Sequence, residues 1–313
     1  MKNRVIKFIG NLMMIASLIF VVHMLLSYEI DFSRFFTWSF LGLFVIITLL
    51  FGFTTFLGSQ NWRLWLELFS VEKLGKVSTF QVFAKSNLGK YLPGNVMHYV
   101  NRQIFCRSLG IKQSEIASAS VLEVLSLMLV AFILGMILAF RPLVELLIRY
   151  TLPQINLFLV IVGLIVGVLF LIVLFIKLKD NSQVKHMVEC IKRPFFLVTF
   201  SKVALVYTFM YLLTGGMLYL LIAYDIPLGW EPLIVIMSAS IISFVIGFIT
   251  PGVPAGIGVR EAVLLFFLAG IAPEYIVITA IIFQRFANII GEVLAWLLSE
   301  ILLKQKMRTE GKA

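Results

Sequence analysis

The chain has 313 residues, of which 61% are hydrophobic and only 13% are charged. Because an average soluble domain carries about 25% charged residues, this composition excludes an ordinary soluble enzyme and a disordered protein. It predicts an all-α polytopic membrane protein. The two cysteines and three histidines form no metal-ligand or redox motif, so we expect no metal and no cofactor.

Six apolar segments have the length of a membrane span, which is about 20 residues. In chain order they cover 8–28, 35–62, 115–140, 150–176, 203–224 and 275–303. The first follows a basic start but lacks a small-residue cleavage site, so we interpret it as a retained helix. Residues 61–76 are expected to lie on the cytoplasmic surface, with Trp62 and Trp65 at the lipid interface.

A Gly-x3-Pro-Gly-x7-Arg pattern occurs twice, once in each half of the chain. Because Pro-Gly breaks a helix, and a broken helix is tolerated at membrane depth only when buried or facing a cavity, we expect two re-entrant helical hairpins, at 77–108 and 232–270. Chance similarity of two turn-rich segments, and an ordinary span at 232–250, are the alternatives. The residues assigned to the hairpin tips are Gly89, Pro93, Gly94, Gly247, Pro251, Gly252, Gly256 and Gly258.

The repeat divides the chain into a first membrane half, 1–145, and a second, 146–313. Each half is expected to hold two spans, a hairpin and a third span, in inverted orientations. On this topology most Lys and Arg residues fall on one side, which predicts that both termini lie in the cytoplasm. The net charge of +10 then reflects topology, and no nucleic-acid partner is expected. Inverted halves with broken helices are typical of secondary transporters.

Ionisable residues at membrane depth form a candidate substrate-binding site. A charge at the bilayer centre costs about 2.5–3.5 kcal/mol, so such residues are expected to face the bundle interior. Arg285, Asn288 and Glu292 share one helix face by their spacing. Arginine suits a phosphate, and a glutamate suits an arginine or a cationic headgroup. The candidate residues are Asn87, Arg102, Glu123, Arg260, Glu261, Arg285 and Glu292.

Two alternatives qualify this interpretation. The deep charges can instead form structural ion pairs, for example Arg285 with Glu261. Lys90 is interpreted as a snorkelling or topology-determining cation outside the site.

The segments NLGKYLPG and PAGIGVREA, together with Arg102, Gly110, Glu123 and Arg285, resemble the lysylphosphatidylglycerol synthase transmembrane-domain family, which is flippase-like. The resemblance implies a stand-alone member without the soluble synthase domain. In the best-known members this domain moves an aminoacylated phospholipid to the outer leaflet, and other relatives accompany glycosyltransferases. The chain departs from the family pattern at Val124, where an arginine is common, and at Ala255, where a glycine is common. The missing arginine weakens the case for headgroup recognition in the first half.

The expected function is therefore non-enzymatic movement of a phospholipid or lipid-linked sugar between the leaflets of the plasma membrane, with a glycosyltransferase or lipid synthase as partner. One alternative is a non-catalytic scaffold for a cell-envelope glycosyltransferase. An intramembrane lipid-modifying enzyme is disfavoured, since no HExxH, Ser-Lys or nucleotide-binding motif occurs.

Overall fold

The computed structural model describes residues 37–70, 74–91, 97–107, 109–149, 182–250 and 256–310. The spans expected at 8–28 and 150–176 lie outside these residues, as do four of the expected tip residues, Pro93, Gly94, Pro251 and Gly252. The described part of the chain is helical and contains no β-strand. The predicted all-α class is confirmed.

Five helices have the length and apolar composition needed to cross a membrane. They are α2 (Trp38–Phe69), α5 (Gln113–Arg149), α8 (Pro194–Ala223), α9 (Trp230–Ile249) and α11 (Glu274–Glu310). Four of them coincide with predicted spans, and α9 covers the first arm of the second expected hairpin. The protein is therefore a multi-pass integral membrane protein.

The remaining elements are short: α3 (Lys76–Asn87), the 3-10 helix η2 (Leu88–Tyr91), α4 (Met97–Arg107), α7 (Ser182–Ile191) and α10 (Val259–Leu268). At about 1.5 Å per residue, α3, α4 and α10 reach at most about two thirds of the ~30 Å hydrocarbon core. Within each expected hairpin the two arms pack against each other, α3 on α4 and α9 on α10. The two hairpins differ, because α9 has the length of a crossing helix and α3 does not.

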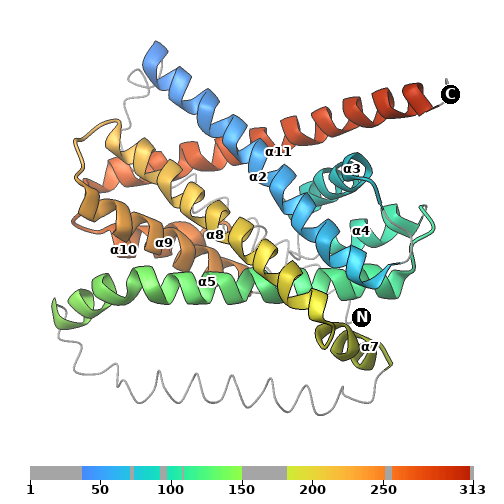
Figure 1. Cartoon of the computed structure of the whole chain (residues 1–313). Coiled ribbons are helices and arrows are strands. Elements are labelled where there is room, and N and C mark those ends of the chain that lie inside the picture. The colour runs from blue at the N-terminus through green and yellow to red at the C-terminus, as the bar shows by residue number, and fades with distance from the viewer. Residues whose placement is uncertain are drawn as a thin grey trace, which may run out of the picture.

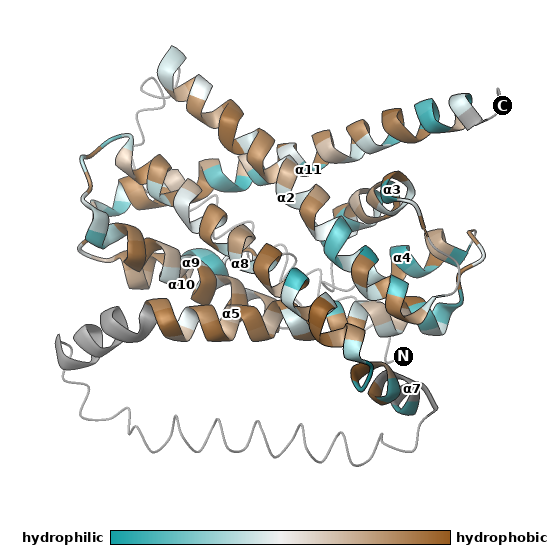
Figure 2. Cartoon of the chain, in the orientation of Figure 1, coloured by the Kyte–Doolittle hydropathy of each residue, from teal (hydrophilic) through white to brown (hydrophobic). Residues whose placement is uncertain are grey.

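The two helix pairs occupy opposite ends of the bundle (Figure 1). In this view α5 runs along one side, α2 and α11 cross on the other, and the α3–α4 and α9–α10 pairs lie between them. Helix α11 packs against α2, α3, α8 and α10, and α5 packs against α2, α4, α8 and α9. Apolar residues cover much of the long helices, whereas hydrophilic residues gather on α4 and α7 (Figure 2).

Helices α2 and α11 meet through their backbones at two glycines. A Cβ added to Gly52 would lie 3.1 Å from the carbonyl oxygen of Gly291, and a Cβ on Gly291 would lie 2.9 Å from the amide nitrogen of Gly52. Small residues permit this approach where any larger side chain would separate the helices. The contact fixes the part of α11 that carries Arg285, Asn288 and Glu292.

The prediction that residues 61–76 lie on the membrane surface is wrong for the first half of this segment. Helix α2 continues to Phe69, and both Trp62 and Trp65 are 0% exposed. The indole of Trp65 donates to the Ser126 hydroxyl over 3.2 Å. These tryptophans fill the core because the last turns of α2 are covered by neighbouring helices, which a linear sequence does not reveal.

Candidate functional site

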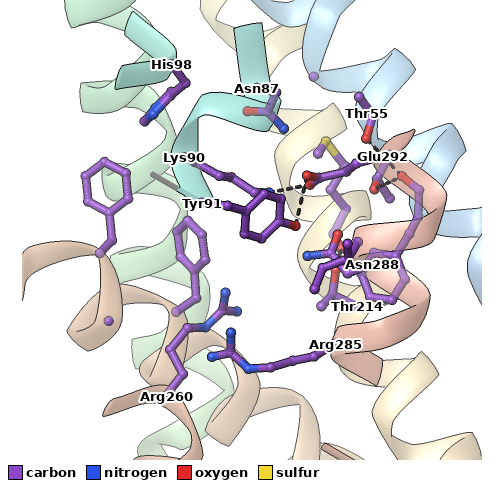
Figure 3. A pocket seen from close by; sticks show the side chains of 18 of the residues that line it. Thr55, Asn87, Lys90, Tyr91, His98, Thr214, Arg260, Arg285, Asn288 and Glu292 are labelled. Atoms are coloured by element: carbon purple, nitrogen blue, oxygen red, sulfur yellow. Dashed lines mark hydrogen bonds and ion pairs between the residues drawn. The ribbon is translucent and has the colours of Figure 1, made fainter. Parts of the chain in front are cut away.

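A cavity of about 450 Å³ lies between the α3–α4 pair, the α9–α10 pair and the long helices. Its walls are largely apolar and aromatic, with polar groups reaching in from several elements (Figure 3). All seven candidate residues line this one cavity: Asn87, Arg102, Glu123, Arg260, Glu261, Arg285 and Glu292. The tertiary structure thus brings together residues spread over some 200 positions, while their role in binding stays a prediction.

Arg102 and Glu123 form a buried ion pair between α4 and α5. Arg102 is 2% exposed, and its guanidinium lies 4.1 Å from the ring centre of Phe83 and 5.2 Å from that of Trp62. An arginine enclosed by a carboxylate and aromatic faces has its charge compensated within the protein. This surrounding favours a positioning role for Arg102.

Glu261 and Arg285 form a second ion pair, which joins α10 to α11. Glu261 also accepts a hydrogen bond of 2.6 Å from the backbone N–H of Gly258, the N-cap of α10. Arg285 donates weakly to the Gly256 carbonyl, over 3.4 Å. The ion pair proposed as an alternative for these two residues is therefore present. The side chain of Arg285 nevertheless still lines the cavity (Figure 3).

Glu292 holds η2, the short 3-10 helix that follows α3. It pairs with Lys90, and the hydroxyl of Tyr91 donates to its second oxygen over 3.0 Å (Figure 3). The snorkelling interpretation of Lys90 is wrong, because η2 turns its side chain into the cavity, toward α11. Sequence reasoning missed Lys90 and Tyr91. The available signal was their place between Gly89 and the Pro-Gly break, together with a deep glutamate that needed a cation.

Arg260 differs from Arg102 and Arg285, the other two arginines that line the cavity. Its guanidinium lies 5.3 Å from the ring centre of Phe244, and no carboxylate in the described part of the chain pairs with it. In Figure 3 the guanidinium groups of Arg260 and Arg285 approach each other from α10 and α11. Arg260 is thus the cavity cation whose charge the described residues leave without an acidic partner.

Two glycines make room for the Arg260 side chain. A Cβ on Gly247 would overlap its Cγ, and a Cβ on Gly256 would lie 2.8 Å from its Cδ. Gly256 also has φ of +71°, a conformation that favours glycine. Gly247 and Gly256 therefore allow the aliphatic part of the Arg260 side chain to pack closely against the backbone at both positions.

Gly89, the counterpart of Gly247 in the first repeat, also lies where two arms meet. A Cβ there would lie 2.7 Å from the Asn101 amide nitrogen and 3.1 Å from the backbone nitrogen of His98. The matched glycines therefore serve a common packing purpose. The matched arginines do not, since Arg102 is paired and enclosed, whereas Arg260 has no acidic partner in the part of the chain that the structure describes.

Neutral polar groups complete the cavity. Gln284 donates to the Thr214 carbonyl over 2.8 Å, which ties α11 to α8. Asn288 lies between Arg285 and Glu292 on the same face of α11, as the sequence predicted (Figure 3). Within the described part of the chain, three or more His, Cys, Asp or Glu side chains nowhere gather as metal ligands would.

The sequence pattern of the family described as "Lysylphosphatidylglycerol synthase TM region" matches residues 9–294, which is most of the chain. No curated protein and no solved structure gives a match. The matched range includes the helices that build the cavity and all seven candidate residues. The chain belongs to the lysylphosphatidylglycerol synthase transmembrane-region family.

Proposed function

We propose that the protein is a translocase that moves a lipid with a phosphate-bearing headgroup between the leaflets of the plasma membrane. Arg260 carries this proposal, because it is a cation at a membrane-embedded cavity without a carboxylate partner among the described residues. A cation in an apolar environment is costly unless it is compensated. A phosphate headgroup would supply that compensation, while the acyl chains stay in the surrounding bilayer.

The same proposal includes the topology. The α3–α4 and α9–α10 pairs act as re-entrant hairpins whose inner ends meet at the cavity, and both termini lie in the cytoplasm. The short α3, α4 and α10 and the mutual packing of the arms support the hairpins. Inverted halves that meet at a central cavity are the arrangement through which secondary transporters expose one site to either side in turn.

Leaflet exchange in proteoliposomes tests the translocase proposal. Purified full-length protein is reconstituted with a trace of phosphatidylglycerol carrying a headgroup-proximal fluorophore, and the fraction accessible to an impermeant quencher is followed over time. We expect wild-type protein to accelerate exchange over protein-free vesicles. Arg260→Gln is expected to lose most of this acceleration, because glutamine keeps hydrogen bonding but removes the charge.

Arg63→Gln is the matched control. Arg63 also lies on a long helix but pairs with Glu67 over 2.8 Å and does not line the cavity. The Arg63→Gln variant is expected to accelerate lipid exchange as much as the wild-type protein does. Wild-type vesicles that exchange no faster than protein-free vesicles would contradict the proposal and favour a scaffolding role beside a glycosyltransferase.

A further inference from the structure

The charges that line the cavity do not cancel. Among the described residues, four lining side chains are cationic and three are carboxylates: Lys90, Arg102, Arg260 and Arg285 against Glu123, Glu261 and Glu292. Each carboxylate is already engaged by one of the cations. The segments that connect the hairpin arms, 92–96 and 251–255, contain no acidic residue. The described cavity therefore has a net charge of +1 and offers no free carboxylate to an ammonium group.

The excess positive charge is concentrated at one end. Arg260 and Arg285 extend toward each other from α10 and α11 (Figure 3), and Glu261 pairs with only one of them. Two like charges that approach within a largely apolar cavity repel each other. An anion with several oxygens, placed between two planar guanidinium groups, removes the repulsion and accepts hydrogen bonds from both.

The rest of the cavity offers neutral hydrogen-bonding groups. Asn288 lies one helical turn from Arg285, and Asn87 faces the cavity from α3 (Figure 3). Neither side-chain amide has a hydrogen-bond partner among the described residues. An amide both donates and accepts, which matches a hydroxyl group that does the same.

Resting on the translocase proposal and extending it to the substrate, we infer that the headgroup is a phosphate joined to a neutral, hydroxyl-bearing group such as glycerol or a sugar. The phosphate lies between Arg260 and Arg285, and the hydroxyls reach Asn288 and Asn87. An aminoacylated, cationic headgroup does not fit, because its ammonium would enter a cavity whose described residues carry a net positive charge and whose described carboxylates are all paired.

A binding panel tests this inference independently of transport. The purified full chain in detergent is titrated by native mass spectrometry with three lipids of identical acyl chains: phosphatidylglycerol, phosphatidylethanol and lysylphosphatidylglycerol. Phosphatidylethanol has the same phosphate charge without hydroxyls. Soluble glycerol phosphate is the fourth probe and reports whether the headgroup alone suffices.

We expect phosphatidylglycerol to bind roughly tenfold more tightly than lysylphosphatidylglycerol, because the ammonium groups of the latter are repelled by the positively charged cavity. It is expected to bind several-fold more tightly than phosphatidylethanol, which lacks the hydroxyls and therefore loses about one neutral hydrogen bond. Arg260→Gln is expected to lower the binding affinity for both anionic lipids, phosphatidylglycerol and phosphatidylethanol, by about tenfold. Asn288→Leu is expected to abolish only the difference between phosphatidylglycerol and phosphatidylethanol. Asn87→Leu gives a second test of the hydroxyl site if the Asn288 variant does not fold, and Arg63→Gln is the control that keeps wild-type binding.

Equal or tighter binding of lysylphosphatidylglycerol would overturn the inference, and so would equal affinity for the two anionic lipids. Glycerol phosphate binding as tightly as the lipid would overturn the assignment to a lipid headgroup. The leaflet-exchange assay separates this failure from failure of the translocase proposal. Selective binding without exchange counts against translocation alone, and exchange without selectivity counts against the headgroup inference alone.

Discussion

Arg102 and Arg260 occupy matching positions of the internal repeat, yet their surroundings are opposite. Arg102 pairs with Glu123 and lies against the ring of Phe83, whereas Arg260 projects into the cavity beside Arg285. The arginine of the first motif is thus a structural residue, and the arginine of the second motif is a candidate ligand. The difference predicts separate consequences for their substitution.

Removal of one partner of the Arg102–Glu123 pair is expected to destabilise the protein. Arg102→Leu or Glu123→Leu leaves an uncompensated buried charge, which costs about 3–5 kcal/mol. The double variant is expected to regain most of this loss, because a buried pair replaced by apolar groups is often neutral. Thermal unfolding in detergent measures the three variants. A double variant as unstable as the sum of the single variants would contradict the structural role.

Gly247→Ala is expected to displace the Arg260 side chain. Its added Cβ overlaps the arginine Cγ, so either the Arg260 side chain or helix α9 must move. We expect loss of lipid binding comparable to that of Arg260→Gln, measured on the same lipid panel. Gly135→Ala is the matched control, since its Cβ would meet Ile241 at an ordinary 3.5 Å. Wild-type binding by the Gly247 variant would show that the arginine stem does not need this space.

The Lys90–Glu292 pair is expected to tolerate a charge swap better than either single reversal. Lys90→Glu places two carboxylates together, Glu292→Lys places two ammonium groups together, and the double variant restores attraction. Directly contacting residues of this kind show coupling energies of about 0.5–3 kcal/mol. Thermal stability and lipid exchange of the four proteins form a double-mutant cycle. Additive effects would show that η2 is not held by α11 through this contact.

Gly291→Ala is expected to lower thermal stability and to impair lipid exchange, because it separates α11 from α2 at their backbone contact. Its Cβ would lie 2.9 Å from the Gly52 nitrogen and 2.9 Å from the Cβ of Phe51. Gly42→Ala is the control, because Gly42 also lies on α2 but a Cβ added there meets no described atom within 4 Å. This variant is expected to remain stable. Equal stability of the two variants would count against tight α2–α11 packing.

Much of the architecture follows from apolar runs and helix breakers. The runs predicted α2, α5, α8 and α11, because a helix that crosses hydrocarbon must satisfy its own backbone and carry apolar side chains. The deep charges were predicted to gather, since each is costly when it faces lipid. All seven candidate residues line one cavity, and their role in binding stays a prediction.

What the sequence determined by itself is the family, the helical class and the set of residues that cannot face lipid. Only the tertiary structure decided which charges neutralise one another. Glu123 pairs with Arg102, Glu261 with Arg285 and Glu292 with Lys90, whereas Arg260 has no acidic partner among the described residues. It also placed Trp62 in the core and Lys90 in the cavity. The physical reason is that hydropathy and spacing act along one chain, whereas ion pairing depends on distances between helices that are far apart in sequence.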